Sequence, residues 1–267
     1  MTGIALALGG GSALGWAHIG VLRALQAGEV PAAAVAGTSI GALVAACYAA
    51  NRLDALEGIA RDMRWWTTIA YLDPLLGRGA LLGGRRIARM LAQHLGHRRL
   101  EDLPIPVALV AADLATGDEI RLAAGPIAPA VRASIALPGI FAPERRDGRW
   151  LIDGGMIANV PLAAAAALAP GRPLVAVDLF ADYAGFVAAS GGVEAIGTLG
   201  AARAGFQMLM RRQTRQAAST IPIAAMIAPR VGAFSPAAFH RAAALIDAGR
   251  VAGEAALPAI RGHLASA

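Results

Sequence analysis

The chain lacks several features that mark common classes of protein. It has one cysteine in 267 residues, so a disulfide within the chain is excluded. None of its 24 basic residues is a lysine, which excludes the lysine-containing phosphate loop of P-loop nucleotide-binding proteins. Its longest apolar runs, at 35–50 and 157–170, are shorter than the roughly 18 residues of a membrane-spanning helix. No group of histidine, cysteine and acidic residues has the spacing of a metal site, so we expect no metal.

The composition is apolar and basic. Hydrophobic residues make up 57% of the chain and charged residues 16%, and the net charge is +6. Such a charge permits contact with anionic lipid or nucleic acid, but arginine in place of lysine also follows from genome composition, which we favour. The first residues, Met1 to Leu8, lack the basic start of a secretion signal. We expect a cytoplasmic protein without a nucleic-acid partner, and peripheral contact with the inner face of an anionic membrane is the minority interpretation.

A glycine loop follows the first predicted strand, Ile4 to Leu8, and precedes a predicted helix at 16–27. Consecutive glycines before a helix let backbone N–H groups converge on a phosphate or a developing oxyanion. The dinucleotide-binding pattern is excluded because Leu14 occupies its last glycine position. We therefore predict an oxyanion loop, with a plain tight turn as the alternative. Its residues are Gly9, Gly10 and Gly11.

A serine corner follows the second predicted strand, at 31–36. A G-x-S-x-G pattern places its central serine on a sharp turn between a strand and a helix, where the hydroxyl is accessible. Right-handed crossovers in a parallel sheet bring this corner and the glycine loop to the same carboxyl edge, facing each other. The corner consists of Gly37, Thr38, Ser39, Ile40 and Gly41.

An aspartate ends a later predicted strand and is followed by two glycines, in the order Asp153, Gly154, Gly155. A carboxylate held there can act as general base toward a nearby hydroxyl. An isolated D-G-G is more often a turn, and this remains the alternative. His240 and His263 also keep open a Ser-Asp-His triad in the chain order of the α/β-hydrolases.

An aromatic and apolar segment broken by glycines extends from 65 to 84. We interpret it as a flap that lines an acyl-binding groove or touches a membrane, and the alternative is a loop packed over the core. The side chains that would carry the first role are Trp65, Trp66, Tyr71, Leu75 and Leu76.

Strands and helices alternate along the rest of the chain, which favours an α/β fold with parallel pairing in one domain, 1–267. The pattern predicts a hairpin at 143–150, buried strands at 174–179 and 221–228, and helices at 193–216 and 236–248. Arginines at 211–215 are expected to be a solvated helix end, with lipid headgroup contact as the alternative.

Four stretches together resemble a known family, the patatin-like phospholipases, and in particular its short bacterial members. They occur within 4–161 in the family's order and spacing. The stretches are Leu8 to Gly20, Gly37 to Gly41, Ala133 to Phe141, and Asp153-Gly154-Gly155 with Asn159 and Pro161.

The resemblance implies a doubly wound three-layer α/β/α sandwich with a mostly parallel sheet, which 162–267 would complete. It implies a lipid acyl hydrolase or esterase with a Ser39–Asp153 dyad, an acyl-enzyme and no cofactor. The oxyanion hole would come from the glycine loop, chiefly the amides of Gly10 and Gly11. Leu14 stands where the family commonly has Arg or Lys. This departure is the one hint of a rival, a lipid-binding or regulatory protein with little turnover.

Overall fold

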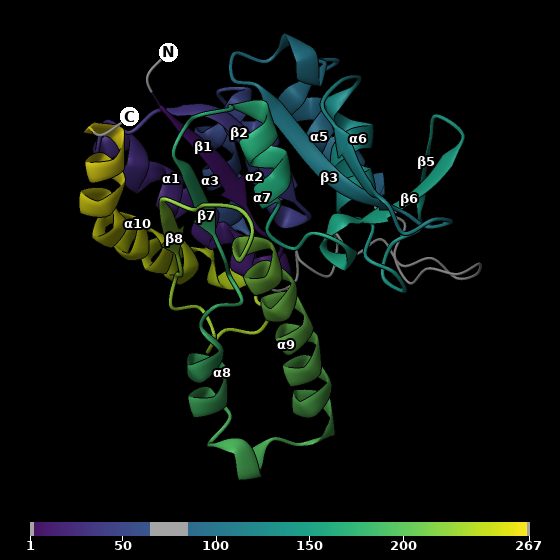
Figure 1. Cartoon of the computed structure of the whole chain (residues 1–267). Coiled ribbons are helices and arrows are strands. Elements are labelled where there is room, and N and C mark those ends of the chain that lie inside the picture. The colour runs from purple at the N-terminus through teal and green to yellow at the C-terminus, as the bar shows by residue number, and fades with distance from the viewer. Residues whose placement is uncertain (1–2, 65–84, 266–267) are drawn as a thin grey trace.

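A mostly parallel sheet forms the centre of the computed structural model, which describes residues 3–64 and 85–265 (Figure 1). Its eight strands follow the order β5-β6-β3-β2-β1-β7-β8, and β4 pairs with β3. The pairs among β3, β2, β1, β7 and β8 are parallel, whereas β4, β5 and β6 pair antiparallel. The strands are β1 Ile4–Leu8, β2 Ala32–Thr38, β3 Val107–Asp113, β4 Glu119–Leu122, β5 Glu144–Arg146, β6 Arg149–Asp153, β7 Leu174–Val177 and β8 Ala225–Ile227.

Helices cover both faces of this sheet, which confirms the three-layer expectation (Figure 1). The larger core cluster joins the sheet to α1, α2 and α10, and the smaller one joins the other face to α7. The described helices are α1 Trp16–Ala27, α2 Ile40–Ala49, α3 Leu53–Asp62, α5 Arg85–Leu95, α6 Ile127–Ser134, α7 Leu162–Leu168, α8 Tyr183–Ala189, α9 Thr198–Ala218 and α10 Ala242–Ala265.

Side-chain size differs between the two faces of β1. Ile4, Leu6 and Leu8 belong to the larger cluster, whereas Ala5 and Ala7 belong to the smaller one. Successive residues of a strand point to opposite faces, so this alternation gives the sheet one bulky and one small-residue face. The alanine-rich α7 packs on the small-residue face.

The C-terminal half differs from the sequence-based expectation in several places. The helix expected at 236–248 is wrong, because α10 extends from Ala242 to Ala265 and continues through Pro258. The helix expected at 193–216 begins only at Thr198, after Gly197. Neither α7 nor α8 was predicted, because both are short and rich in alanine and so show little amphipathic periodicity.

Close packing of α1 against α10 explains the length of α10. A Cβ on Gly20 would overlap the carbonyl of Ile246, and a Cβ on Gly249 would overlap the carbonyl of Ala17. The two helices therefore approach at backbone distance. Tertiary packing of this kind outweighs local propensity, which is why a proline near the end does not stop the helix.

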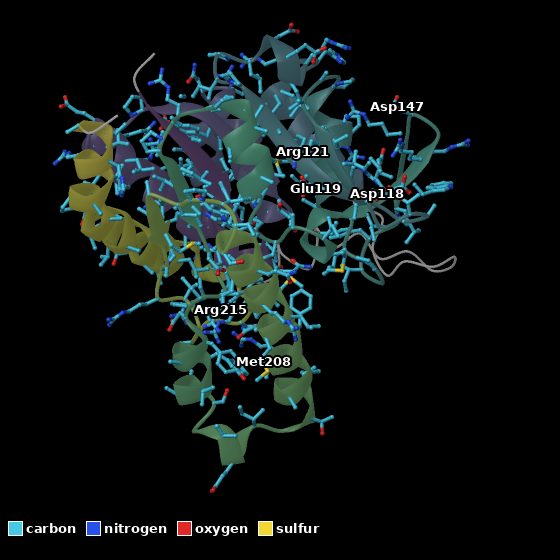
Figure 2. All side chains as sticks on the ribbon, in the orientation of Figure 1. Asp118, Glu119, Arg121, Asp147, Met208 and Arg215 are labelled. Carbon is cyan, nitrogen blue, oxygen red and sulfur yellow. The ribbon has the colours of Figure 1, made fainter. Side chains whose placement is uncertain are left out.

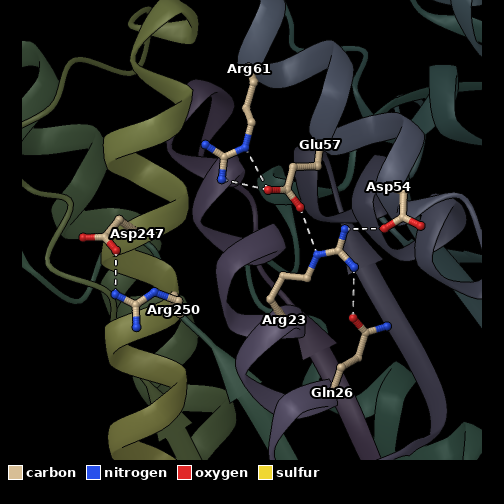
Figure 3. A network of polar contacts seen from close by, with 7 residues as sticks. All are labelled: Arg23, Gln26, Asp54, Glu57, Arg61, Asp247 and Arg250. Carbon is tan, nitrogen blue, oxygen red and sulfur yellow. Dashed lines mark hydrogen bonds and ion pairs between the residues drawn. The ribbon is translucent and has the colours of Figure 1, made fainter.

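Ion pairs at the surface tie α1 to α3 (Figure 3). Arg23 Nε donates to Glu57 Oε2 at 2.9 Å, and Arg23 Nη2 lies 2.5 Å from Asp54 Oδ1. Glu57 also pairs with Arg61 at 2.8 Å. Ion pairs at the surface contribute at most about 1 kcal/mol each to stability. The packing of α1 and α3 on the sheet therefore depends on the apolar core more than on this network.

We expect Gly20→Ala to lower the free energy of unfolding by about 2 kcal/mol or more, because the added methyl group must push α10 away from α1. Gly58→Ala is the matched control. It lies on the exposed side of α3 with nothing within 4 Å of its Cβ position, so it should raise stability by up to about 1 kcal/mol. Urea unfolding of both variants measures the difference, and equal effects would contradict the packing argument.

Candidate active site

Ser39 occupies a strained corner between β2 and α2. Its backbone has φ 56° and ψ −126°, in the left-handed region that L side chains rarely adopt. The corner is tight on both sides, since a Cβ on Gly37 would overlap the carbonyl of Gly41 and a Cβ on Gly41 would overlap that of Leu8. Such strain in a non-glycine residue persists only where the surrounding structure holds it, and it is common at active sites.

A short hydrogen bond joins Ser39 to Asp153. The Oγ of Ser39 donates to Oδ2 of Asp153 at 2.6 Å. Asp153, at the end of β6, is 3% exposed, and its Oδ1 accepts the backbone N–H of Gly155 at 2.7 Å. Within 3–64 and 85–265, no histidine forms a hydrogen bond with either group. The geometry brings a hydroxyl and a carboxylate into direct contact.

Burial shifts the acidity of this carboxylate. It raises the pKa of Asp153 from 3.8 to about 6, and the hydrogen bonds from Ser39 and Gly155 partly oppose the shift. A base with a pKa near the working pH is both ionised and able to accept a proton. Asp153 therefore has the properties of a general base toward Ser39.

The glycine loop lies beside Ser39, as the parallel pairing of β1 with β2 predicts. A Cβ on Gly10 would lie 3.4 Å from the Cβ of Ser39. His18 supports the loop through Nε2, which lies 2.7 Å from the carbonyl oxygen of Gly9. Burial lowers the pKa of His18 to about 4, so the imidazole is neutral and donates this bond.

Two of the three loop amides are not free for an oxyanion. The N–H of Gly9 donates to Val177 O at 3.1 Å, and that of Gly10 donates to Asn159 O at 2.9 Å. The expectation for Gly9 and Gly10 as donors is therefore corrected. Among the described residues no acceptor is present for the N–H of Gly11 or of the next residue, Ser12. Within the glycine loop, these two amides are the available donors.

Ser134 supports the corner, although no role was predicted for it from the sequence. Its fully buried Oγ accepts the backbone N–H of Ser39 at 3.0 Å and donates to Val110 O at 2.5 Å. The bond pairs an amide at the strained corner and fixes it to β3. Its only signal in the sequence was its position within the matching stretch 133–141.

The loop after Asp153 is held from two sides. Thr38 Oγ1 donates to Ala158 O at 2.8 Å. From α9, Gln213 donates to Met156 O at 2.9 Å and accepts the N–H of Asn159 at 3.1 Å. The loop after Asp153 is thus bonded to both β2 and α9.

The other residues predicted for the site are either packed in the core or lie outside the described part of the chain. Gly154 lies against β3, where a Cβ would overlap the carbonyl of Val110, and Ile40 is almost fully buried. Leu14 is completely buried in the larger core cluster and brings no charge to the loop. The predicted flap residues lie outside the described residues: Trp65, Trp66, Tyr71, Leu75 and Leu76.

Residues 3–64 and 85–265 show neither a metal site nor a membrane-spanning helix. This part of the chain contains no group of three or more His, Cys, Asp or Glu side chains suited to a metal ion. None of its helices combines the length and the apolar character needed to cross a membrane.

Several proteins that carry a family name are similar to this chain in sequence. An uncharacterized NTE family protein of Mycobacterium bovis is 41% identical over 160 residues, which are 60% of this chain and 44% of that protein. A second one from this species is 34% identical over 276 residues, covering 96% of this chain and 46% of that protein. Patatin-like phospholipase domain-containing protein 6 of Mus musculus is 35% identical over 184 residues, covering 66% and 13%. The chain thus spans less than half the length of these relatives.

A solved structure shares the fold. VipD from Legionella pneumophila matches 97% of this chain and 66% of its own with a TM-score of 0.53, at 14% sequence identity. A family model described as patatin-like phospholipase matches residues 6–166, a range that contains the glycine loop, Ser39 and Asp153. The chain therefore belongs to the patatin-like phospholipase family.

Proposed function

We propose that this protein is a lipid acyl hydrolase that uses Ser39 as nucleophile and Asp153 as general base. The observation that carries the proposal is the 2.6 Å hydrogen bond from Ser39 Oγ to Asp153 Oδ2 at a strained corner. Family membership supports the lipid ester as substrate class.

In the proposed first step, Asp153 takes the proton of Ser39 while Oγ forms a bond to the ester carbonyl carbon. The N–H groups of Gly11 and Ser12 stabilise the negative oxygen of the tetrahedral intermediate. Its collapse breaks the bond to the alcohol, which leaves with the proton from Asp153. The acyl group then stays on Ser39.

Water completes the cycle by the same route. Asp153, again ionised, takes a proton from the water as it attacks the acyl carbonyl. The fatty acid leaves, and the proton returns from Asp153 to Ser39. Both steps require a carboxylate that is ionised near neutral pH, which its pKa of about 6 provides.

The rival Ser-Asp-His triad has less support. In a triad the histidine lies between the acid and the serine, whereas here the carboxylate contacts the hydroxyl directly. His240 lies in a short 3₁₀ helix, Phe239–Arg241, and His263 lies near the end of α10. Among the described residues, neither histidine forms a hydrogen bond with Ser39 or Asp153.

Ser39→Ala and Asp153→Asn should each lower kcat on a short soluble ester by about 10⁴-fold or more, since both remove a group that acts in every turnover. His240→Ala and His263→Ala should keep most of the wild-type rate. A fluorophosphonate label should react with the wild-type chain and not with Ser39→Ala. A histidine variant that is folded by circular dichroism yet as inactive as Ser39→Ala would favour the triad instead.

Asp153→Asn should also stabilise the fold at pH 8. The carboxyl group of Asp153 has a pKa near 3.8 in the unfolded chain and about 6 in the folded one. Between pH 4 and pH 6 the unfolded chain therefore ionises more readily, and the folded state loses stability as the pH rises. This loss is complete above pH 6 and persists at pH 8. We expect the variant to gain about 2–3 kcal/mol at pH 8 and little at pH 4. Urea unfolding at both pH values measures this, with the exposed Asp118→Asn as control (Figure 2). A gain independent of pH would rule out the burial argument.

Gly11→Ala should slow kcat by roughly 10²- to 10³-fold, the cost of a lost oxyanion donor. The added methyl would lie 2.7 Å from Cδ1 and 3.2 Å from Cβ of Leu179, which is held in the buried core, so we expect the loop to move and its amide to turn away from the reacting carbonyl. Stopped-flow acylation with a chromogenic ester measures the step, and Gly58→Ala is the control. Unchanged acylation in a folded Gly11→Ala chain would remove Gly11 from the mechanism.

A further inference from the structure

A helical arm projects from the side of the sheet at which the parallel strands end and Ser39 lies (Figure 1). We define the arm as residues 183–218, which comprise α8, α9 and the link between them. It follows the carboxyl end of β7, and because β7, β1 and β2 are parallel, this is the edge where the glycine loop and Ser39 lie. A surface that the arm binds is therefore on the active-site side of the molecule.

Large apolar side chains are exposed along the arm. Single exposed apolar residues are ordinary on a protein surface, but a group on one projecting element indicates a binding surface. Leu199 is 85% exposed, Val193 72% and Leu209 62%, and Phe206 and Met208 are exposed as well.

The charges of α9 have one sign. The helix contains arginines and no acidic residue. Arg211, Arg212 and Arg215 line a hollow of about 620 Å³ together with Met208, Gln216 and Ser219. Arg212 and Arg215 form no salt bridge with any described residue, although Arg211 and Arg215 are close enough to influence the buried Asp178. Guanidinium groups gathered in this way suit phosphate groups.

Exposed apolar and exposed basic residues are separated along the helix axis. Arg203, which lies among the apolar residues, is half-buried and donates to the carbonyl groups of Gly232 and Phe234. The exposed apolar residues begin at Leu199, near the tip, and the exposed arginines follow toward the base (Figure 2, where Met208 lies nearer the tip than Arg215). The 21 residues of α9 span about 30 Å. This order matches a bilayer surface, in which acyl chains lie deeper than anionic headgroups.

We propose that the arm docks on an anionic phospholipid surface, with Leu199 and Leu209 inserted and Arg212 and Arg215 at the headgroup phosphates. The inference rests on the proposed function, since it supplies the lipid that the dyad hydrolyses. Gln213 lies among these arginines and holds Met156 and Asn159. Docking thus places the membrane beside the loop that follows Asp153.

A second copy of the chain fits the arm less well. Two identical arms packed side by side would bring their arginine groups together, and like charges at close range repel. An anionic lipid surface satisfies both the apolar and the basic part of the arm.

The test measures vesicle binding by flotation in a Ser39→Ala background, so that hydrolysis does not enter the result. Vesicles contain phosphatidylcholine with or without phosphatidylglycerol. We expect binding only with phosphatidylglycerol, weakened by salt. Arg212→Gln/Arg215→Gln should lower the affinity about 30-fold, from about 1 kcal/mol for each arginine. Leu199→Ser/Leu209→Ser should lower it at least about tenfold.

The controls carry the same chemical changes elsewhere. Arg52→Gln/Arg172→Gln removes two exposed charges away from the arm, and Val251→Ser replaces an exposed apolar residue of α10. Both should bind as the Ser39→Ala parent does. Equal binding to both vesicle types, equal loss in arm and control variants, or no vesicle binding with a dimer that the arm variants abolish would each overturn the proposal. Hydrolysis of a short soluble ester by the wild-type chain is measured apart, and its absence would count against the proposed function alone.

Discussion

The close approach of three backbone segments at Ser39 is the constraint on which the rest of the site depends. The corner brings α2 so near to β1 and β2 that a Cβ at Gly37 or Gly41 would overlap a carbonyl group. This approach forces Ser39 to positive φ and directs its Oγ to Asp153. The cost of such a conformation is of order 1–3 kcal/mol, and the bond from the Ser39 amide to Ser134 helps to offset it.

Burial of Asp153 links stability to the proposed chemistry. A carboxylate withdrawn from water is less stable when ionised, so the fold loses free energy at the pH at which the base is active. The N–H of Gly155 limits this loss by bonding one oxygen, while the other stays with Ser39. A more hydrated carboxylate would stabilise the fold and be a weaker base. The proposed mechanism therefore depends on a residue that opposes folding at neutral pH.

Local patterns predicted the parts of the site that local geometry determines. The strand, corner and helix around Ser39 follow from apolar runs and glycine spacing, and the structure has them. Contacts between distant segments could not be predicted in this way. Ser134, 95 residues after Ser39, accepts a hydrogen bond from the Ser39 amide. The amide of Gly10, which was expected to bind an oxyanion, donates to the carbonyl oxygen of Asn159. The course of α10 through Pro258 likewise depends on its packing against α1.

Because residue 14 is a leucine, positive charge near the site comes from α9 and not from the glycine loop. The resemblance described above leads one to expect Arg or Lys at this position, whereas Leu14 is a buried part of the core. The glycine loop consequently offers neutral N–H donors and no charged side chain, so its attraction for an anionic lipid at a distance is weaker than that of a guanidinium group. The arginines of α9 lie on the same side of the sheet, on the helix whose Gln213 bonds the loop after Asp153. In the proposed scheme, attraction of the lipid and stabilisation of its oxyanion thus belong to separate elements, so each can change without disturbing the other.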